Sequence, residues 1–223
     1  LFLIGLFIGY PHLTALDQGV MTLVQEHRGP TLDEIAVTFT LIGEFRNMLL
    51  FSALLTGLLL LCRQWRQALF AGGTLLCTAL ANTATKSFFA RVRPEVLTDP
   101  LTTYSMPSGH ASGAFALFLT LGVLAGRGQP PRMRLTWLLL ACLPALSIAL
   151  SRVYLGAHWP TDVLAGAMLA ACVCAASLWL NQRQTPLNAM PFKVWWLILP
   201  ALLALFSFFA LRHLPPAMLR YAY

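Results

Sequence analysis

The sequence predicts an all-α fold, a polytopic bundle of transmembrane helices, from its composition and its long apolar runs. Hydrophobic residues make up 58% of the 223 residues and charged residues only 10%, whereas roughly 25% are charged in a typical soluble domain. The mean hydropathy is +0.70. These values exclude an ordinary soluble globule, a disordered chain and a small disulfide-stapled domain, and they favour a membrane protein.

Six apolar stretches account for the expected helices, since a bilayer core needs about 20 residues of helix. In chain order they are 36–62, 67–85, 109–126, 135–150, 163–180 and 194–211. Glu44 and Arg46 interrupt the first, so its membrane part is predicted as 47–62, preceded by an amphipathic segment. Residues 1–9 are expected to be part of a further helix that is truncated at Leu1.

The connections between these stretches alternate in charge. Those at 62–67, 126–134 and 181–193 contain seven Lys or Arg and no acid, whereas all eight acids lie in the other connections. Successive loops of a helical bundle lie on opposite sides of the membrane, so the alternation supports the helix assignment, and basic loops favour the cytoplasm. The formal net charge of +7 comes from residues at the ends of apolar runs, which favours lipid head groups and an anionic substrate over nucleic acid.

Ionisable residues beside membrane helices are costly, so three clusters at helix ends need an explanation. The first follows the 67–85 stretch and reads Lys86-Ser-Phe-Phe-Ala-Arg91-Val-Arg93-Pro94. Three cations within eight residues fit either snorkelling anchors at the membrane surface or a clamp for an anion. In such a clamp lysine supplies a point charge and arginine a planar fork.

The second cluster is Pro107-Ser108-Gly109-His110, immediately before the next apolar stretch. Serine is a preferred helix N-cap, glycine allows close approach to the backbone, and the N–H groups of a helix N-terminus attract anions. His110 adds a titratable group at that position. The pattern fits an ordinary capped helix start as well as an anion site.

The third cluster runs from Ser151-Arg152 to His158-Trp-Pro-Thr-Asp162, where the 163–180 stretch begins. A carboxylate near an imidazole fixes its tautomer and raises the basicity of the far ring nitrogen. A single histidine is usually structural. A histidine followed four residues later by an aspartate, with Arg152 nearby, favours a catalytic function.

Together the clusters read Lys-x6-Arg-Pro, Pro-Ser-Gly-His and Ser-Arg-x5-His-x3-Asp over residues 86–162. This pattern resembles the type 2 phosphatidic acid phosphatase superfamily of integral-membrane lipid phosphatases. The resemblance implies that the phosphate is bound by Lys86, Arg93, Arg152, Ser108 and the backbone N–H of Gly109. It also implies that His158 is the nucleophile that forms a phosphohistidine, that Asp162 orients and activates it, and that His110 protonates the leaving group. No metal and no other cofactor is implied. Arg91 falls outside the motif and is interpreted as a rim or anchor residue.

The resulting hypothesis is metal-independent dephosphorylation of a lipid phosphate or pyrophosphate, such as undecaprenyl pyrophosphate, phosphatidic acid or phosphatidylglycerophosphate. The expected partners are that lipid substrate and the bilayer, and the oligomeric state is left open. Two alternatives stay open: a lipid phosphotransferase that uses the same intermediate, and an anion transporter or scaffold. We expect a bacterial inner membrane with the site on the periplasmic face, opposite the basic loops.

We expect one membrane phosphatase domain over 1–223, with a six-helix core at about 36–181 and an extra helix at about 194–211. Only 12 residues separate Pro94 from Pro107, which is little material for a lid over the site. The segment 11–46 is therefore the candidate cover.

Overall fold

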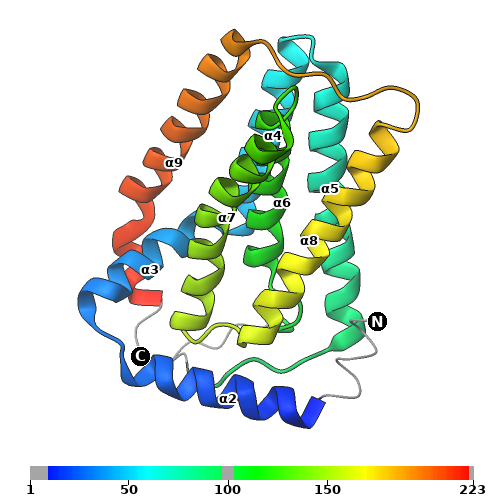
Figure 1. Ribbon diagram of the computed structural model, residues 1–223. Helices are drawn as coiled ribbons and strands as arrows, with labels where there is room; N and C mark the ends of the chain where they lie inside the picture. The colour runs from blue at the N-terminus through cyan, green and yellow to red at the C-terminus, as the bar shows by residue number, and fades with distance from the viewer. Residues whose placement is uncertain (1–9, 97–102, 221–223) are drawn as a thin grey trace.

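The computed structural model describes residues 10–96 and 103–220, and these residues form eight α-helices and no strand. In chain order the helices are α2 (Tyr10–Glu26), α3 (Pro30–Ile42), α4 (Phe45–Leu61), α5 (Trp65–Phe89), α6 (Gly109–Ala125), α7 (Pro131–Tyr154), α8 (Pro160–Asn181) and α9 (Phe192–Arg220). The predicted all-α fold with an additional C-terminal helix is confirmed (Figure 1).

Four of these helices, α5, α7, α8 and α9, are long and apolar enough to cross a bilayer. The pair α3 and α4 passes the same test together but bends by 52° at its break, which lies at Gly43 and Glu44. The division into an amphipathic segment and a membrane part at 47–62 stays a prediction. Helix α6 is apolar but shorter, at 17 residues. The expected partial helix at 1–9 lies outside the described residues.

Local sequence explains where several helices begin. Ser108 caps α6, because its Oγ accepts a hydrogen bond from the backbone N–H of Ala111 at 3.4 Å. Helices α7 and α8 begin with Pro131 and Pro160, whose fixed φ suits the first turn and whose missing N–H is not needed there. The motif residues are thus placed at helix ends by ordinary capping chemistry.

Helix α6 lies at the centre of the bundle and packs against α4, α5, α7 and α8. Its contact face carries small residues, among them Ala111 and Ala114, which are completely buried. Gly166 of α8 approaches so closely that a Cβ built on it would stand 2.6 Å from the carbonyl oxygen of Ser108. Small residues at these crossings bring the beginnings of α6 and α8 together.

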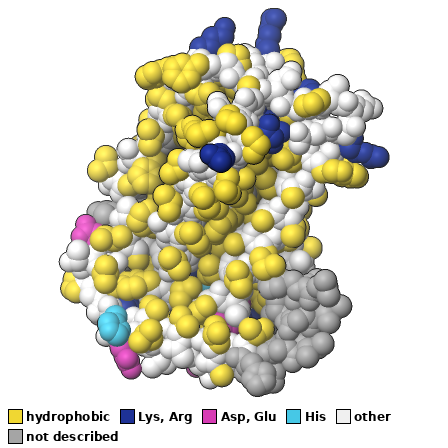
Figure 2. All heavy atoms as spheres, in the orientation of Figure 1, with side chains coloured by type: hydrophobic (Ala, Val, Ile, Leu, Met, Phe, Trp, Pro, Cys, Tyr) yellow, Lys and Arg dark blue, Asp and Glu magenta, His cyan; other side chains and the backbone are white. Residues whose placement is uncertain are grey.

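The two ends of the bundle differ in charge. The three acid-free connections, α4–α5, α6–α7 and α8–α9, all lie at the upper end in Figure 1, and α2 lies across the lower end. In Figure 2 most Lys and Arg gather near the upper end, the acids and a histidine lie lower, and hydrophobic side chains cover the middle. The predicted alternation of loops between two sides is therefore present in the fold.

Candidate active site

The position of His158 follows from the turn that ends α7. Gly156 has φ +69°, in the left-handed region that glycine adopts without penalty. The N–H of Gly156 donates to the carbonyl of Val153 and the N–H of Ala157 to that of Arg152, both at 3.0 Å, which is the Schellman pattern of helix termination. The turn folds the chain back, so that the N–H of His158 also reaches the Arg152 carbonyl, at 3.2 Å.

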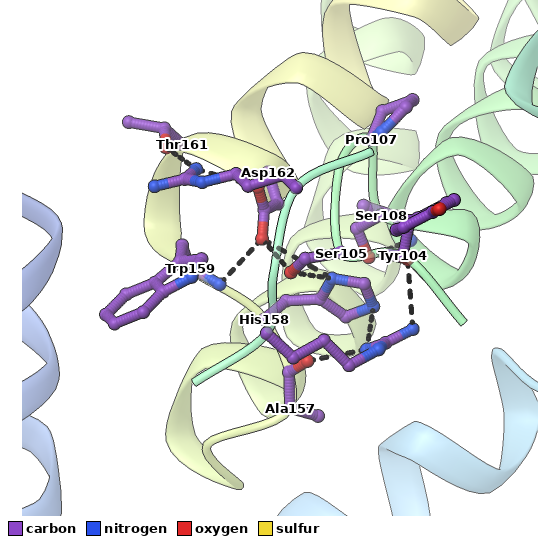
Figure 3. A network of polar contacts seen from close by, with 12 residues as sticks. Tyr104, Ser105, Pro107, Ser108, Ala157, His158, Trp159, Thr161 and Asp162 are labelled. Carbon is purple, nitrogen blue, oxygen red and sulfur yellow. Dashed lines mark hydrogen bonds and ion pairs between the residues drawn. The ribbon is translucent and has the colours of Figure 1, made fainter. Parts of the chain in front are cut away.

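The His158 ring is buried beside the Asp162 carboxylate at the start of α8 (Figure 3). Its Nδ1 is 3.6 Å from Oδ2 of Asp162, which is longer than a hydrogen bond. Ser105 joins the two groups: its hydroxyl donates to Oδ2 of Asp162 and lies 3.4 Å from Nδ1 of His158. The backbone N–H of Trp159 donates to the same carboxylate oxygen at 2.9 Å. The carboxylate therefore reaches the imidazole chiefly through Ser105.

The other ring nitrogen, Nε2, lies 3.1 Å from Nη1 of Arg93. A guanidinium has donors only, so Nε2 accepts this hydrogen bond and Nδ1 carries the ring proton. Burial, followed by the positive charges of Arg152, Arg93 and Lys86, holds the pKa of His158 well below its ordinary value. A neutral imidazole thus directs the lone pair of Nε2 toward the cations.

Arg93 and Lys86 are held by oxygens of the link between α5 and α6 and of the turn between α7 and α8. Arg93 donates from Nε to the carbonyl of Thr103 at 2.7 Å, from Nη1 to the carbonyl of Ala157 at 2.6 Å, and from Nη2 to Oγ1 of Thr103 at 2.9 Å. Lys86, in the last turn of α5, donates to the carbonyl of Tyr104 at 2.6 Å. Protein oxygens thus hold both cations in place, and an anion would exchange with some of these contacts.

Arg152 is the third cation, and only 1% of its surface is exposed. Its Nη1 donates to Oγ1 of Thr40 at 2.6 Å, and Thr40 belongs to α3. A buried guanidinium is unfavourable unless its N–H groups and its charge are matched. Arg152 thus places a buried positive charge beside His158, and α3 contributes to the site through Thr40, a residue far from the motifs.

His110 occupies the second position of α6, after Gly109, at the helix end whose N–H groups attract anions. The N–H of Ser108 donates to the carbonyl of Asp162 at 2.9 Å, which ties the beginnings of α6 and α8 together. His110 lies close enough to His158 to interact with it electrostatically. Its Nε2 is buried and has no hydrogen-bond partner among the described residues, so this nitrogen is available to a bound group.

The interpretation of Arg91 as a rim or anchor residue is wrong. Its Nη1 lies 2.8 Å from Oδ1 of Asp162, and its Nη2 lies 2.6 Å from Oδ2 of Asp17 in α2. Burial by itself would lower the pKa of Arg91, but Asp162 and Asp17 outweigh it and raise this pKa above its ordinary value. Arg91 therefore stays charged and binds carboxylates inside the site.

The structure brings the predicted site residues to one place from four helices, the link before α6 and the turn between α7 and α8: Lys86, Arg93, Ser108, Gly109, His110, Arg152, His158 and Asp162. Sequence reasoning missed Ser105, Thr40 and Asp17. Ser105 lies three residues before a motif serine, whereas Thr40 and Asp17 have no local signal because only the folded chain brings them near. Among the described residues no group of three or more His, Cys, Asp or Glu is placed to hold a metal ion, and metal independence stays a prediction.

A family model described as the PAP2 superfamily matches residues 66–186, which is more than half of the chain and includes all three motifs. The chain belongs to the PAP2 superfamily. The resemblance read from the motifs is therefore confirmed. The segment 11–46, which supplies Asp17 and Thr40, lies outside the PAP2 match.

Two curated relatives of this PAP2 protein are phosphatases by name. The undecaprenyl-diphosphatase of Sulfolobus acidocaldarius is 39% identical over 95 residues, which is 40% of each chain. The phosphatidylglycerophosphatase B of Bacillus subtilis is 33% identical over 92 residues, which is 39% of this chain and 44% of that protein. The matches thus span less than half of the length of either relative.

A crystal structure shares the fold. It is described as the first transmembrane PAP2 type phosphatidylglycerolphosphate phosphatase from Bacillus subtilis, and it matches this PAP2 chain with a TM-score of 0.70 at 23% identity. The match covers 82% of this chain and 95% of that one. The PAP2 membrane-phosphatase fold therefore extends well beyond the residues that carry the motifs.

Proposed function

We propose that this PAP2 protein hydrolyses a phosphate or diphosphate ester of a membrane lipid through a phosphohistidine formed on His158. The observation that carries the proposal is the convergence of three cations and a second histidine on the buried His158 ring. Phosphoryl transfer depends on positioning and on neutralising the charge of the phosphoryl oxygens. Three fixed cations beside a helix N-terminus supply both.

The first chemical step forms a bond between nitrogen and phosphorus. A bound phosphate takes over the hydrogen bond that Arg93 donates to Nε2 of His158, which frees the lone pair of that nitrogen. Nε2 attacks phosphorus as the bond to the lipid oxygen breaks, and His110 donates a proton to the departing oxygen. The ring proton on Nδ1 stays next to Ser105 and Asp162, which favour the positive charge that develops on the imidazole.

The second step releases inorganic phosphate. A water molecule attacks phosphorus while His110 accepts its proton, and the N–P bond breaks to return the electron pair to Nε2 of His158. The carboxylate of Asp162 and the hydroxyl of Ser105 again hold the ring proton. Lys86, Arg93 and Arg152 offset the charge on the phosphoryl oxygens, and the N-terminus of α6 at Gly109 adds N–H donors.

The substrate class follows from where the site lies. The cations lie at helix ends, at the lower end of an apolar bundle, so the head group of a lipid reaches them while its chains stay in the bilayer. The names of the relatives support undecaprenyl pyrophosphate and phosphatidylglycerophosphate as candidates, and phosphatidic acid has the same chemistry. We place the site on the periplasmic face of a bacterial inner membrane, because the acid-free basic loops lie at the other end.

A phosphate-release assay on the purified protein in detergent tests this function. Phosphatidic acid, phosphatidylglycerophosphate and undecaprenyl pyrophosphate are supplied separately, with and without EDTA. We expect phosphate from at least one lipid, no effect of EDTA, and no release by His158→Ala. Absence of release from all three lipids, or full activity of His158→Ala, would refute the proposal. Transfer of the phosphoryl group to an added alcohol without phosphate release would identify a phosphotransferase instead.

Labelling of single cysteines tests the orientation. In a cysteine-free background, His27→Cys at the end of α2 and Gln129→Cys in the α6–α7 connection lie at opposite ends of the bundle. We expect a membrane-impermeant reagent applied to intact cells to label position 27 only. Labelling of position 129 alone would reverse the orientation.

A further inference from the structure

Asp17 is a fully buried acid that the family match does not contain. Its Oδ1 accepts the backbone N–H of Thr161 at 3.0 Å, and its Oδ2 accepts the Thr161 hydroxyl at 2.5 Å and Nη2 of Arg91 at 2.6 Å. Thr161 belongs to the first turn of α8. A buried carboxylate is stable only when it is paired and hydrogen-bonded. These contacts therefore fasten α2 to the helix end that carries Asp162.

Arg91 connects this carboxylate to the site. One side of its planar guanidinium holds Asp17, and the other side, Nη1, donates to Oδ1 of Asp162 at 2.8 Å and to the Thr161 hydroxyl at 2.7 Å. The guanidinium carbon lies 5.6 Å from the centre of the Trp159 ring. A planar fork keeps two carboxylates at a set separation in a way that a flexible ammonium does not.

We propose that Asp17 and Arg91 are positioning residues that hold Asp162 in the orientation from which it supports His158, so that α2 is part of the active site. This inference rests on the proposed function, in which His158 is the nucleophile. Arg91 holds Oδ1 of Asp162, which leaves Oδ2 directed to Ser105 and toward Nδ1 of His158.

Asp17 also affects how strongly the negative charge of Asp162 acts on the His158 ring. Because Arg91 is shared between two carboxylates, it does not neutralise Asp162 alone. Without the charge of Asp17, Arg91 would compensate Asp162 fully, and the proton on Nδ1 of His158 would lose part of its support. The charged and titratable groups that face His158 from the other elements are Lys86 of α5, Arg93 of the link, His110 of α6, Arg152 of α7 and Asp162 of α8.

The substitution Asp17→Asn tests the proposal. The Thr161 N–H and Arg91 donate to different oxygens of Asp17. In an asparagine one of these oxygens becomes an NH2 donor, so one of the two contacts is lost together with the charge. The matched control is Asp33→Asn, because Asp33 forms a similar two-point pair with Arg28, at 3.0 and 3.1 Å, near the start of α3. Both variants lose the carboxylate of an Arg–Asp pair, but only Asp17 shares its arginine, Arg91, with Asp162.

We measure phosphate release from phosphatidic acid, or from whichever lipid the wild type hydrolyses, as a function of pH. For Asp17→Asn we expect kcat to fall about tenfold with KM within about twofold, as for the loss of a group that positions rather than contacts the substrate. The acid limb of its kcat/KM profile should move to lower pH, because less negative charge supports the protonated His158 ring. For Asp33→Asn we expect wild-type values of all three quantities.

The possible outcomes separate the explanations. The proposal would be overturned if Asp17→Asn and Asp33→Asn had the same kcat and the same acid limb of the kcat/KM profile. It would also be overturned if Asp17→Asn lost kcat while its acid limb stayed at the wild-type pH, because that result indicates a merely structural role. If Asp17→Asn is not monodisperse in detergent, Arg91→Lys decides, since it keeps the charge but removes the fork: a similar fall in kcat supports the proposal and an unchanged kcat overturns it. A wild type that releases no phosphate refutes the proposed function instead.

Discussion

Gly43, between α3 and α4, lies against the proposed acid His110, and an added methyl group there tests how tightly that ring is placed. A Cβ built on Gly43 would stand 2.8 Å from Cδ2 of His110 and 2.6 Å from Cγ2 of Ile148. Gly43 has φ −74° and ψ −5°, which any residue adopts, so Gly43→Ala introduces no backbone strain. The effect of the substitution is therefore one of contact alone.

The size of the effect follows from these distances. Ordinary contact begins at 3.4 Å, so the His110 ring must retreat by about 0.6 Å in a close-packed interior. A misplacement of about 1 Å costs on the order of 10²-fold in rate, so we expect Gly43→Ala to lower kcat on a lipid substrate about 10- to 100-fold. Overpacking of this kind costs about 1–3 kcal/mol of stability, which lowers the melting temperature and leaves the protein folded.

The assay is phosphate release from phosphatidic acid and from nitrophenyl phosphate. The control is Gly57→Ala in the middle of α4, because a Cβ built on Gly57 meets nothing within 4 Å. Nitrophenyl phosphate should recover part of the rate of Gly43→Ala, since its leaving group departs without protonation. A kcat within twofold of that of Gly57→Ala, or equal losses on the two substrates, would refute the reasoning.

Four further predictions concern the histidines and the α6–α8 contact. His158→Ala should lose all turnover, whereas His110→Ala should be partly rescued by nitrophenyl phosphate in the same release assay; equal rescue of both variants would contradict the two roles. Because burial and nearby cations lower the pKa of His158, the acid limb of kcat/KM should lie below pH 6.5, the ordinary histidine value. Because of the same shift, His158 binds a proton more tightly in the unfolded chain than in the folded protein. The free energy of unfolding should therefore keep its full His158 contribution above about pH 6.5 and lose it as the pH falls below that value. A melting temperature that stays constant between pH 7 and 5 in a thermal-shift assay would argue against a neutral buried ring. Gly166→Ala would place its Cβ 2.6 Å from the Ser108 carbonyl oxygen and 3.1 Å from the Ser112 backbone nitrogen. Because backbone atoms cannot move aside as side chains do, we expect the protein to lose about 1–3 kcal/mol of stability or more, seen as a lower melting temperature. An unchanged melting temperature would show that α6 and α8 separate freely.

Much of the fold was predictable because a membrane helix can be recognised from a continuous apolar run in the local sequence. Apolar runs and alternating basic loops predicted the helices from α4 to α9, and Glu44 and Arg46 marked the interruption of the first apolar run, where the structure bends. The exact ends of the helices could not be predicted as well. The 194–211 stretch belongs to a helix of 29 residues, Phe192–Arg220. Its last turns contain Arg212, Pro215 and Pro216, so they lack the apolar pattern by which a span is predicted.

The candidate site likewise contains residues that local motifs predicted and residues whose role only the fold revealed. The motif residues were found because phosphate chemistry requires cations, a helix N-terminus and an imidazole near a carboxylate, and these occur as short patterns at helix ends. Arg91 was misassigned since its partner Asp17 lies 74 residues away in sequence. A pattern within eight residues shows that a cation is present but not which group it binds.

The sequence by itself determined that this chain lies in a membrane and that it belongs to the PAP2 superfamily, and it predicted the eight residues of the proposed phosphate site. These properties depend on composition and on spacing along single helix ends. Only the tertiary structure decided that Ser105 mediates between His158 and Asp162, that Thr40 holds Arg152, and that α2 reaches into the site. The physical reason is that buried polar groups take the partners that helix packing brings within hydrogen-bond distance, and packing joins residues that no local pattern connects.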